Sequence, residues 1–157
     1  MLRISHLKII SLISLFTLAF LILFFNDFRG QNLQINCRTS QYREDLVNGQ
    51  EFLTTIVMIL SPEGKGEINF LGSLKHGQQN EYLVSRTVYF NYSLHNGNEL
   101  LMSSMRVVRT IEDTTPDALF SRNVIDLSTK VHRLFIKRIY NAYMVSTPYS
   151  ATGICVE

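Results

Sequence analysis

The chain has 157 residues, with 15 Lys and Arg, 13 Asp and Glu, and two cysteines. This length suits about one domain. From residue 31 onward basic and acidic residues are equal in number, 12 of each, so the positive excess belongs to the first 30 residues. A neutral domain lacks the basic surface that general nucleic-acid binding needs, and we expect no direct contact with nucleic acid.

The N-terminal region contains one uncharged apolar run, from Ile9 to Phe25. With the residue that follows, the run reaches about 18 residues, the lower limit for a helix that crosses a hydrocarbon core of about 30 Å. A cleaved signal peptide is the alternative, but no small-residue cleavage site follows the run. The pattern therefore predicts an uncleaved transmembrane signal anchor at residues 9–26.

The charges beside this run predict its orientation. Arg3 and Lys8 precede it, whereas the two charges just after it cancel. Positively charged flanks stay in the cytoplasm, so the remainder of the chain is exported. We expect a cytoplasmic N-terminus at residues 1–8, the anchor, and an exported β-rich domain at residues 27–157.

The two cysteines, Cys37 and Cys155, lie near the two ends of the exported domain. In an oxidising compartment an even number of cysteines at such positions favours a disulfide. Two buried thiols are the alternative. Zinc has little support, because two distant cysteines without a clustered histidine do not supply a tetrahedral ligand set. No metal site is predicted.

The first half of the exported domain reads as short strands separated by loops. Apolar residues alternate or run together between stretches rich in Gly, Pro and polar residues, and this pattern is typical of antiparallel strands. The predicted strands are Asn32–Arg38, Phe52–Leu60 and Glu67–Leu71, with loops at Thr39–Gln50 and Gly72–Asn80.

The strongest local signal is a hairpin centred on Asn96-Gly97, which joins strands at Tyr82–His95 and Asn98–Ile111. Asn-Gly readily adopts the positive φ angles of a two-residue type I′ turn. That turn predicts that Val107 lies opposite Arg86. Strands of about 13 residues extend roughly 43 Å, so we expect them to bend or to contain a bulge.

Thr114-Thr115-Pro116-Asp117 predicts the start of a short helix, with a hydroxyl cap, a proline in the first turn and an early acid. Lys130–Tyr143 fits a helix or a strand, and its β-branched and aromatic content favours a strand. A turn and another strand, Tyr143–Thr147, follow. The predicted class is α+β, mainly antiparallel β: an N-terminal transmembrane helix followed by a small curved sheet or barrel-like periplasmic domain with one short helix.

Catalytic motifs do not occur in the sequence. No serine lies in Gly-x-Ser-x-Gly, and there is no dinucleotide, phosphate-loop or His-Glu-x-x-His pattern. The acidic pairs Glu44-Asp45 and Glu112-Asp113 border predicted loops, where solvated charges are expected. We therefore predict no enzymatic activity and no cofactor.

Two arginines are the candidate contacts for a ligand or a partner. The predicted hairpin places Arg86 and Arg109 close together on an otherwise apolar face, where two cations could hold the anionic group of a small amphipathic ligand. The alternative is that they lie at the margin of the sheet or pair with an acid such as Glu81 or Glu112.

Three histidines, His76, His95 and His132, lie in the exported domain. Imidazole is the side chain that changes charge most readily between pH 5 and 8, so these residues are candidates for pH sensing. Each is isolated in the sequence, and ordinary surface histidines are the alternative.

The whole arrangement resembles a family. It combines a basic N-terminus, the apolar run, a β-rich domain, an early Cys37, Asn141-Ala142-Tyr143 and the ending Tyr149-Ser150-Ala151-Thr152-Gly153-Ile154-Cys155. These features are similar to the FidL/ToxS-like membrane accessory proteins of ToxR-like regulators, most of all to the MyfF and PsaF fimbrial regulatory proteins of Yersinia.

The resemblance implies a single-pass protein of the bacterial inner membrane with a periplasmic C-terminal domain. Such a protein would bind and stabilise a ToxR-like transmembrane transcription activator and couple an environmental signal to a fimbrial or virulence operon. Exposed strand edges could pair with the partner. A periplasmic chaperone-like assembly factor for a secreted surface structure is the alternative function.

Overall fold

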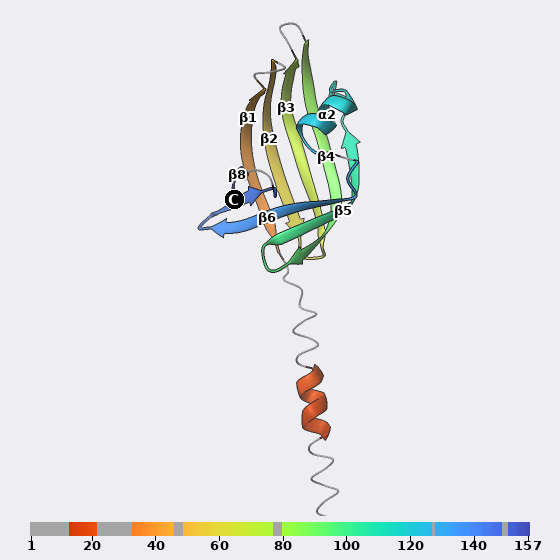
Figure 1. Ribbon diagram of the computed structural model, residues 1–157, viewed down its shortest axis with the longest axis vertical. Helices are drawn as coiled ribbons and strands as arrows, with labels where there is room; N and C mark the ends of the chain where they lie inside the picture. Colours follow the sequence, from red (N-terminus) through yellow and green to blue (C-terminus); the bar gives the residue numbers. More distant parts are fainter. Residues whose placement is uncertain (1–12, 22–32, 46–48, 77–79, 127, 149–150) are drawn as a thin grey trace, which may run out of the picture. The chain divides into compact units, whose positions relative to one another are not determined.

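The chain divides into two units, residues 1–32 and 33–157, and each is treated by itself. The computed structural model (Figure 1) describes residues 13–21, 33–45, 49–76, 80–126, 128–148 and 151–157. In the first unit residues 13–21 form a helix with exposed apolar side chains.

The predicted transmembrane helix is wrong for this structure. Among the described residues no helix combines the length and the apolar character that a membrane crossing requires. The remainder of the predicted anchor and the predicted cytoplasmic N-terminus, residues 1–8, lie outside the described residues.

The second unit is a closed barrel of antiparallel strands (Figure 1), in which each strand pairs with the next and the last returns to the first. A short helix, α2, lies between β5 and β6. The strands are β1 (Ile35–Asp45), β2 (Gln50–Ser61), β3 (Lys65–His76), β4 (Asn80–His95), β5 (Glu99–Arg109), β6 (Val131–Ile139), β7 (Ala142–Ser146) and β8 (Ala151–Val156); α2 is Asp117–Asn123.

The predicted α+β class is therefore corrected to an eight-stranded barrel, with short helices at residues 13–21 and at α2 within the described part of the chain. The sequence did not indicate β8, because a short segment that contains a glycine and follows a proline has little strand character of its own. Its pairing with β7 makes it a strand.

Alternating side chains fill the barrel interior. In β2, Phe52, Met58 and Leu60 are buried, whereas Leu53 is 55% exposed on the outer face. Successive side chains of a strand point to opposite faces, so one face of β2 supplies the core and the other meets solvent.

The hairpin between β4 and β5 forms, but its predicted register is wrong. The turn between His95 and Glu99 contains three residues rather than two. Asn96 and Gly97 have the expected positive φ angles, 49° and 79°. One extra residue moves every cross-strand partner by one position.

A β-bulge shifts the register of this hairpin again. Two residues of β5, one of them Ser104 with a φ of 52°, oppose Phe90. This confirms the expected bend or bulge. Beyond it Arg86 lies opposite Arg109, where the prediction placed Val107.

Near the start of the domain β1 is longer than the sequence predicted, and near its end β6 and β7 are strands as predicted. Residues 39–50 were expected to form a loop, but β1 continues to Asp45 and pairs with β2 over its whole length. Polar residues are compatible with that strand because its outer face and one edge meet solvent. The strand interpretation of the ambiguous segment is confirmed by β6, and β7 follows a turn at Tyr140 and Asn141.

Candidate functional site

Strands β1 to β4 continue beyond the closed ring as a sheet (Figure 1), with β1 and β4 as its two edges. Along β4 the pairing with β5 ends at Arg86. A segment at residues 110–115, here called the edge segment, then takes the place of a strand. Its backbone amides at Thr110 and Thr114 donate to the carbonyls of Ser85 and Leu83, each at 3.0 Å.

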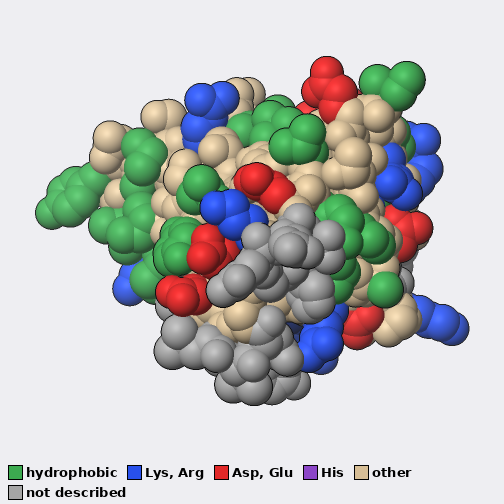
Figure 2. All heavy atoms as spheres, turned by 90° about the horizontal axis from the view of Figure 1, so that it is seen from above, with side chains coloured by type: hydrophobic (Ala, Val, Ile, Leu, Met, Phe, Trp, Pro, Cys, Tyr) green, Lys and Arg blue, Asp and Glu red, His purple; other side chains and the backbone are tan. Residues whose placement is uncertain are grey.

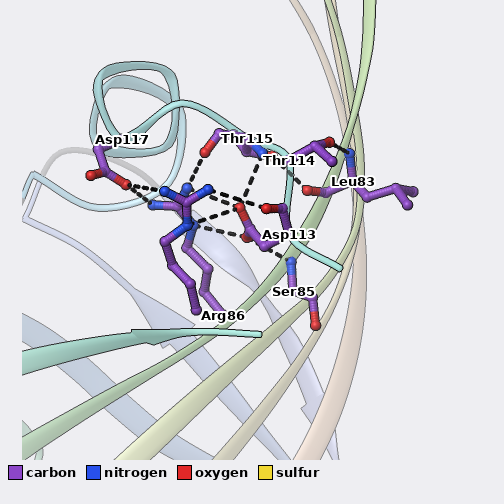
Figure 3. A network of polar contacts seen from close by, with 8 residues as sticks. Leu83, Ser85, Arg86, Asp113, Thr114, Thr115 and Asp117 are labelled. Carbon is purple, nitrogen blue, oxygen red and sulfur yellow. Dashed lines mark hydrogen bonds and ion pairs between the residues drawn. The ribbon is translucent and has the colours of Figure 1, made fainter. Parts of the chain in front are cut away.

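Side chains of the edge segment supply the acceptors that a neighbouring strand would supply. The Ser85 amide donates to Oδ2 of Asp113, and the Leu83 amide donates to Oγ1 of Thr114, both at 2.9 Å (Figure 3). The Thr115 hydroxyl donates to the Leu83 carbonyl at 2.8 Å. The hydrogen-bonding groups of β4 at these two residues are therefore satisfied by side-chain and backbone groups of the edge segment.

Arg86 is the centre of the network in Figure 3, and it is only 2% exposed. Its Nε and Nη2 donate to the two carboxylate oxygens of Asp113 at 2.9 and 3.0 Å. Nη1 donates to Asp117 at 2.7 Å, and Nη2 also donates to the carbonyl of Thr115. Such a two-pronged arginine–carboxylate pair is a strong and geometrically specific interaction.

The ionisation of this buried pair is set by the contacts within it. Burial alone opposes the charged carboxylate, but hydrogen bonds from Arg86 and from the Ser85 and Thr115 amides outweigh it and lower the pKa of Asp113. Likewise, burial opposes the charged guanidinium, but Asp113 and Asp117 outweigh it and raise the pKa of Arg86. Both groups are therefore charged at neutral pH.

Helix α2 is fixed to the barrel by an aromatic residue as well as by charge. Phe120 has no exposed surface, and its ring lies edge-on to Phe70 with 5.6 Å between centroids. The Arg86 guanidinium lies 4.5 Å above the same ring. The short helix is confirmed, but its predicted hydroxyl cap is wrong, because Pro116 is the N-cap and no side chain caps the helix.

The structure brings Arg86 and Arg109 together, as the sequence predicted, and gives both of them acidic partners. Arg109 lies 3.5 Å from Asp113 and 3.6 Å from Asp117. The acids named in the sequence-based alternative, Glu81 and Glu112, are not these partners. Asp113 was expected to be a solvated turn charge, whereas its side chain has no exposed surface.

A cavity of about 640 Å³ lies elsewhere in the barrel. Inward side chains of the strands line its walls, and charged or polar side chains from β1 and from residues 123–134 also border it. Its apolar lining includes Phe52, Ile56, Met58, Ile68, Phe70, Met102, Leu134 and Val145, and its charged or polar lining includes Gln41, Arg43, Asp126, His132 and Arg133. No local sequence pattern predicted this cavity, because its lining residues come from separate strands.

The predicted disulfide is confirmed. Cys37 and Cys155 form a bond with 5.3 Å between their Cα atoms, and each cysteine is 2% exposed. The bond joins β1 to β8, the two strands that close the barrel. One pair between these strands, Arg38 with Val156, is in register in the described part of the chain.

The three predicted histidines lie in different places. His76 ends β3, and His95 is exposed at the β4 end of the hairpin. His132 lines the cavity opposite Met102 on β5, and its Nε2 is buried without a hydrogen-bond partner among the described residues. Whether any of them senses pH remains a prediction.

Comparison with known proteins gives a family but no individual relative. No curated protein and no solved structure matches the chain. Residues 72–155 match the family described as "FidL-like putative membrane protein". This region contains the Arg86 network, α2 and the C-terminal strands, and it is more than half of the sequence. The likeness to MyfF and PsaF stays a prediction, but the broader resemblance is confirmed: the chain belongs to the FidL-like family of membrane proteins.

Proposed function

We propose that the barrel is the periplasmic domain of an inner-membrane accessory protein. It binds and stabilises a ToxR-like transmembrane transcription activator, and it couples an environmental signal to expression of a fimbrial or virulence operon. The membrane association of the family supports the location. A disulfide between Cys37 and Cys155 suits an oxidising compartment such as the periplasm.

The observation that carries the partner-binding proposal is the edge of β1. The pairing of β1 with β8 is limited to Arg38, and no described strand pairs with residues 40–44 on the side away from β2. Backbone groups at such an edge can accept a strand from another protein. The other edge of the same sheet, at β4, is occupied by the edge segment, so β1 is the available position for a partner strand.

The surface around the sheet suits a protein partner better than a polyanion. Figure 2 looks onto one end of the molecule, where acidic, basic and hydrophobic side chains lie side by side. A nucleic acid or another polyanion would need basic side chains gathered on one face, and this view shows both signs of charge interspersed.

Proline substitutions in β1 test this surface. Adjacent residues of a strand direct their N–H groups to opposite sides, so only one of Ser40→Pro and Gln41→Pro removes an outward donor. We expect that variant to keep its thermal stability and to lose co-purification with the activator. Ser40→Ala and Gln41→Ala are the controls. Undiminished co-purification by both proline variants would contradict the proposal, and capture of a surface-structure subunit instead would favour the chaperone-like function.

We also propose that the signal includes a small amphipathic ligand in the cavity rather than at Arg86 and Arg109. A volume of about 640 Å³ lies within the usual range for small-molecule sites, roughly 300–1,000 Å³. The apolar walls suit a hydrophobic body. Arg43 at the border suits an anionic group, and Nε2 of His132, which has no hydrogen-bond partner among the described residues, suits a polar one.

Filling the cavity tests the ligand proposal. Ile56→Trp places a larger ring at the cavity wall, whereas Leu53→Trp changes an exposed residue on the outer face of the same strand. We expect the first variant to reduce the fluorescence of an anilinonaphthalene sulfonate dye bound to the protein and the second to leave it unchanged. Equal dye binding by both variants would contradict the site.

A further inference from the structure

The contact between β1 and β8, here called the seam, is the shortest strand pairing among the described ladders of the barrel. It consists of the single pair Arg38 and Val156. The neighbouring ladder of β1 with β2 runs along the whole of both strands. Because backbone hydrogen bonds hold antiparallel strands together, a ladder of one pair contributes little to closing the barrel.

The disulfide lies at this seam. Cys37 immediately precedes Arg38, and Cys155 immediately precedes Val156, so the covalent bond is beside the one registered pair. The bond therefore supplies the link that the hydrogen bonds hardly provide. It joins residues separated by 118 positions, and no short connection holds the two strands together in its absence.

The seam is also a border of the cavity. Thr39 on β1 and Gly153 and Cys155 on β8 all line it. A Cβ at Gly153 would lie 3.4 Å from Oγ1 of Thr39, so the two strands approach closely there. Separation of β8 from β1 would widen the cavity toward solvent.

Strands β2 to β4, away from the seam, are held together by long hydrogen-bonded ladders. The ladders of β2 with β3 and of β3 with β4 are continuous over their full lengths. The pair of Arg86 and Asp113 adds a buried connection between β4 and the edge segment. Neither support involves a cysteine, so reduction of the disulfide removes none of these contacts.

We propose that the bond between Cys37 and Cys155 is a redox-sensitive latch for the barrel, and that its reduction separates β8 from β1 and opens the cavity while β2 to β4 stay folded. A thiolate of a dithiol reductant, such as the active site of a thiol–disulfide oxidoreductase, attacks one sulfur, forms a mixed disulfide with that cysteine and releases the other cysteine, which takes up a proton. The second thiol of the reductant then displaces the first cysteine, and the reductant becomes a disulfide. The protein gains two electrons and two protons as two thiols.

Hydrogen–deuterium exchange of the full-length protein tests the latch without a partner or a ligand, so its result is independent of the proposed function. We expect reduction with dithiothreitol to accelerate amide exchange in β8 and in residues 35–38 by on the order of tenfold or more. Exchange in β3 should change less than twofold. The double variant Cys37→Ser with Cys155→Ser should resemble the reduced protein and ignore the reductant.

Two results would overturn the latch. Unchanged exchange at the seam after verified reduction would show that the disulfide does not hold it closed. An equal acceleration in β3 would show that the bond stabilises the whole barrel rather than the seam. The reduction experiment starts from the folded, oxidised protein. It therefore tests the latch even where the double variant does not fold.

Discussion

Arg86 and Arg109 are direct cross-strand partners, and both guanidinium groups reach the carboxylate of Asp113. Two cations at this spacing would repel each other in a poorly hydrated site. Asp113 lies between them and Asp117 contacts both, so the cluster is balanced. The two arginines that were predicted from the sequence to bind an external anion are therefore paired with carboxylates of the same protein.

Removing the central carboxylate should be the most damaging change to this cluster. Asp113→Asn leaves Arg86 buried without its two-pronged partner, and we expect a loss of about 3–5 kcal/mol in the free energy of unfolding. Urea denaturation measures it. Asp117→Asn is the matched control, because that side chain is 74% exposed and its pair should contribute less than about 1 kcal/mol. Equal losses would contradict the central role of Asp113.

The same carboxylate predicts how stability depends on pH. The pKa of Asp113 is lower in the folded protein than its ordinary value, because hydrogen bonds from Arg86 and the Ser85 and Thr115 amides outweigh burial. Its stabilising contribution is therefore complete above the unfolded-state pKa, about 3.9. It is lost as the pH falls through the lower folded-state pKa. Unfolding measured between pH 7 and 2 should show this loss, and the Asp113→Asn variant should show a smaller one.

Tyr92 on β4 connects the segment just before β1 to the rest of the barrel through its hydroxyl group. Its hydroxyl lies 2.9 Å from the carbonyl of Leu33 and 2.7 Å from that of Ser61. Burial raises its pKa, so the phenol stays protonated and can donate. Tyr92→Phe should cost about 1–2 kcal/mol in thermal unfolding. Tyr140→Phe is the control, because Tyr140 is 93% exposed; a similar loss there would contradict the role of the Tyr92 hydroxyl.

Gly72 is required by the close approach of β2 and β3. A Cβ at this position would lie 2.0 Å from the carbonyl oxygen of Leu53 and 2.8 Å from Cα of Thr54. Because backbone atoms cannot turn aside as a side chain can, Gly72→Ala should destabilise the barrel by about 3 kcal/mol. Chemical denaturation beside Ser73→Ala, the adjacent control, measures the difference. A neutral Gly72→Ala variant would refute the close approach.

Local patterns predicted much of the barrel. Alternation and turn residues located strands in the regions of β2 to β7, and the position of Pro116 and Asp117 located α2. The register of the central hairpin was wrong because Asn-Gly occurs in three-residue as well as two-residue turns. Strand β8 and the outer half of β1 were missed because neither segment has strong strand character of its own: β8 is short and contains Gly153, and the outer half of β1 is polar. Each is a strand through pairing with its neighbour, β7 or β2.

The candidate sites were predicted less completely, for a related reason. The pairing of Cys37 with Cys155 could be predicted because the chain has only two cysteines. The proximity of Arg86 and Arg109 could be predicted because both lie on one hairpin. The sequence did not reveal that Asp113 is buried, because the acid follows the strand in an apparently ordinary turn. Its environment arises only when the edge segment folds back along β4.

The edge segment along β4 has a consequence for stoichiometry. A sheet with two open edges can add strands at both and can grow into a chain of molecules. Here the β4 edge is filled at Leu83 and Ser85 by hydroxyl, carboxylate and backbone groups of the same protein. A strand added at β1 would therefore complete a one-to-one complex, because the other edge of this sheet, in the part of the chain that the structure describes, is already occupied at Leu83 and Ser85.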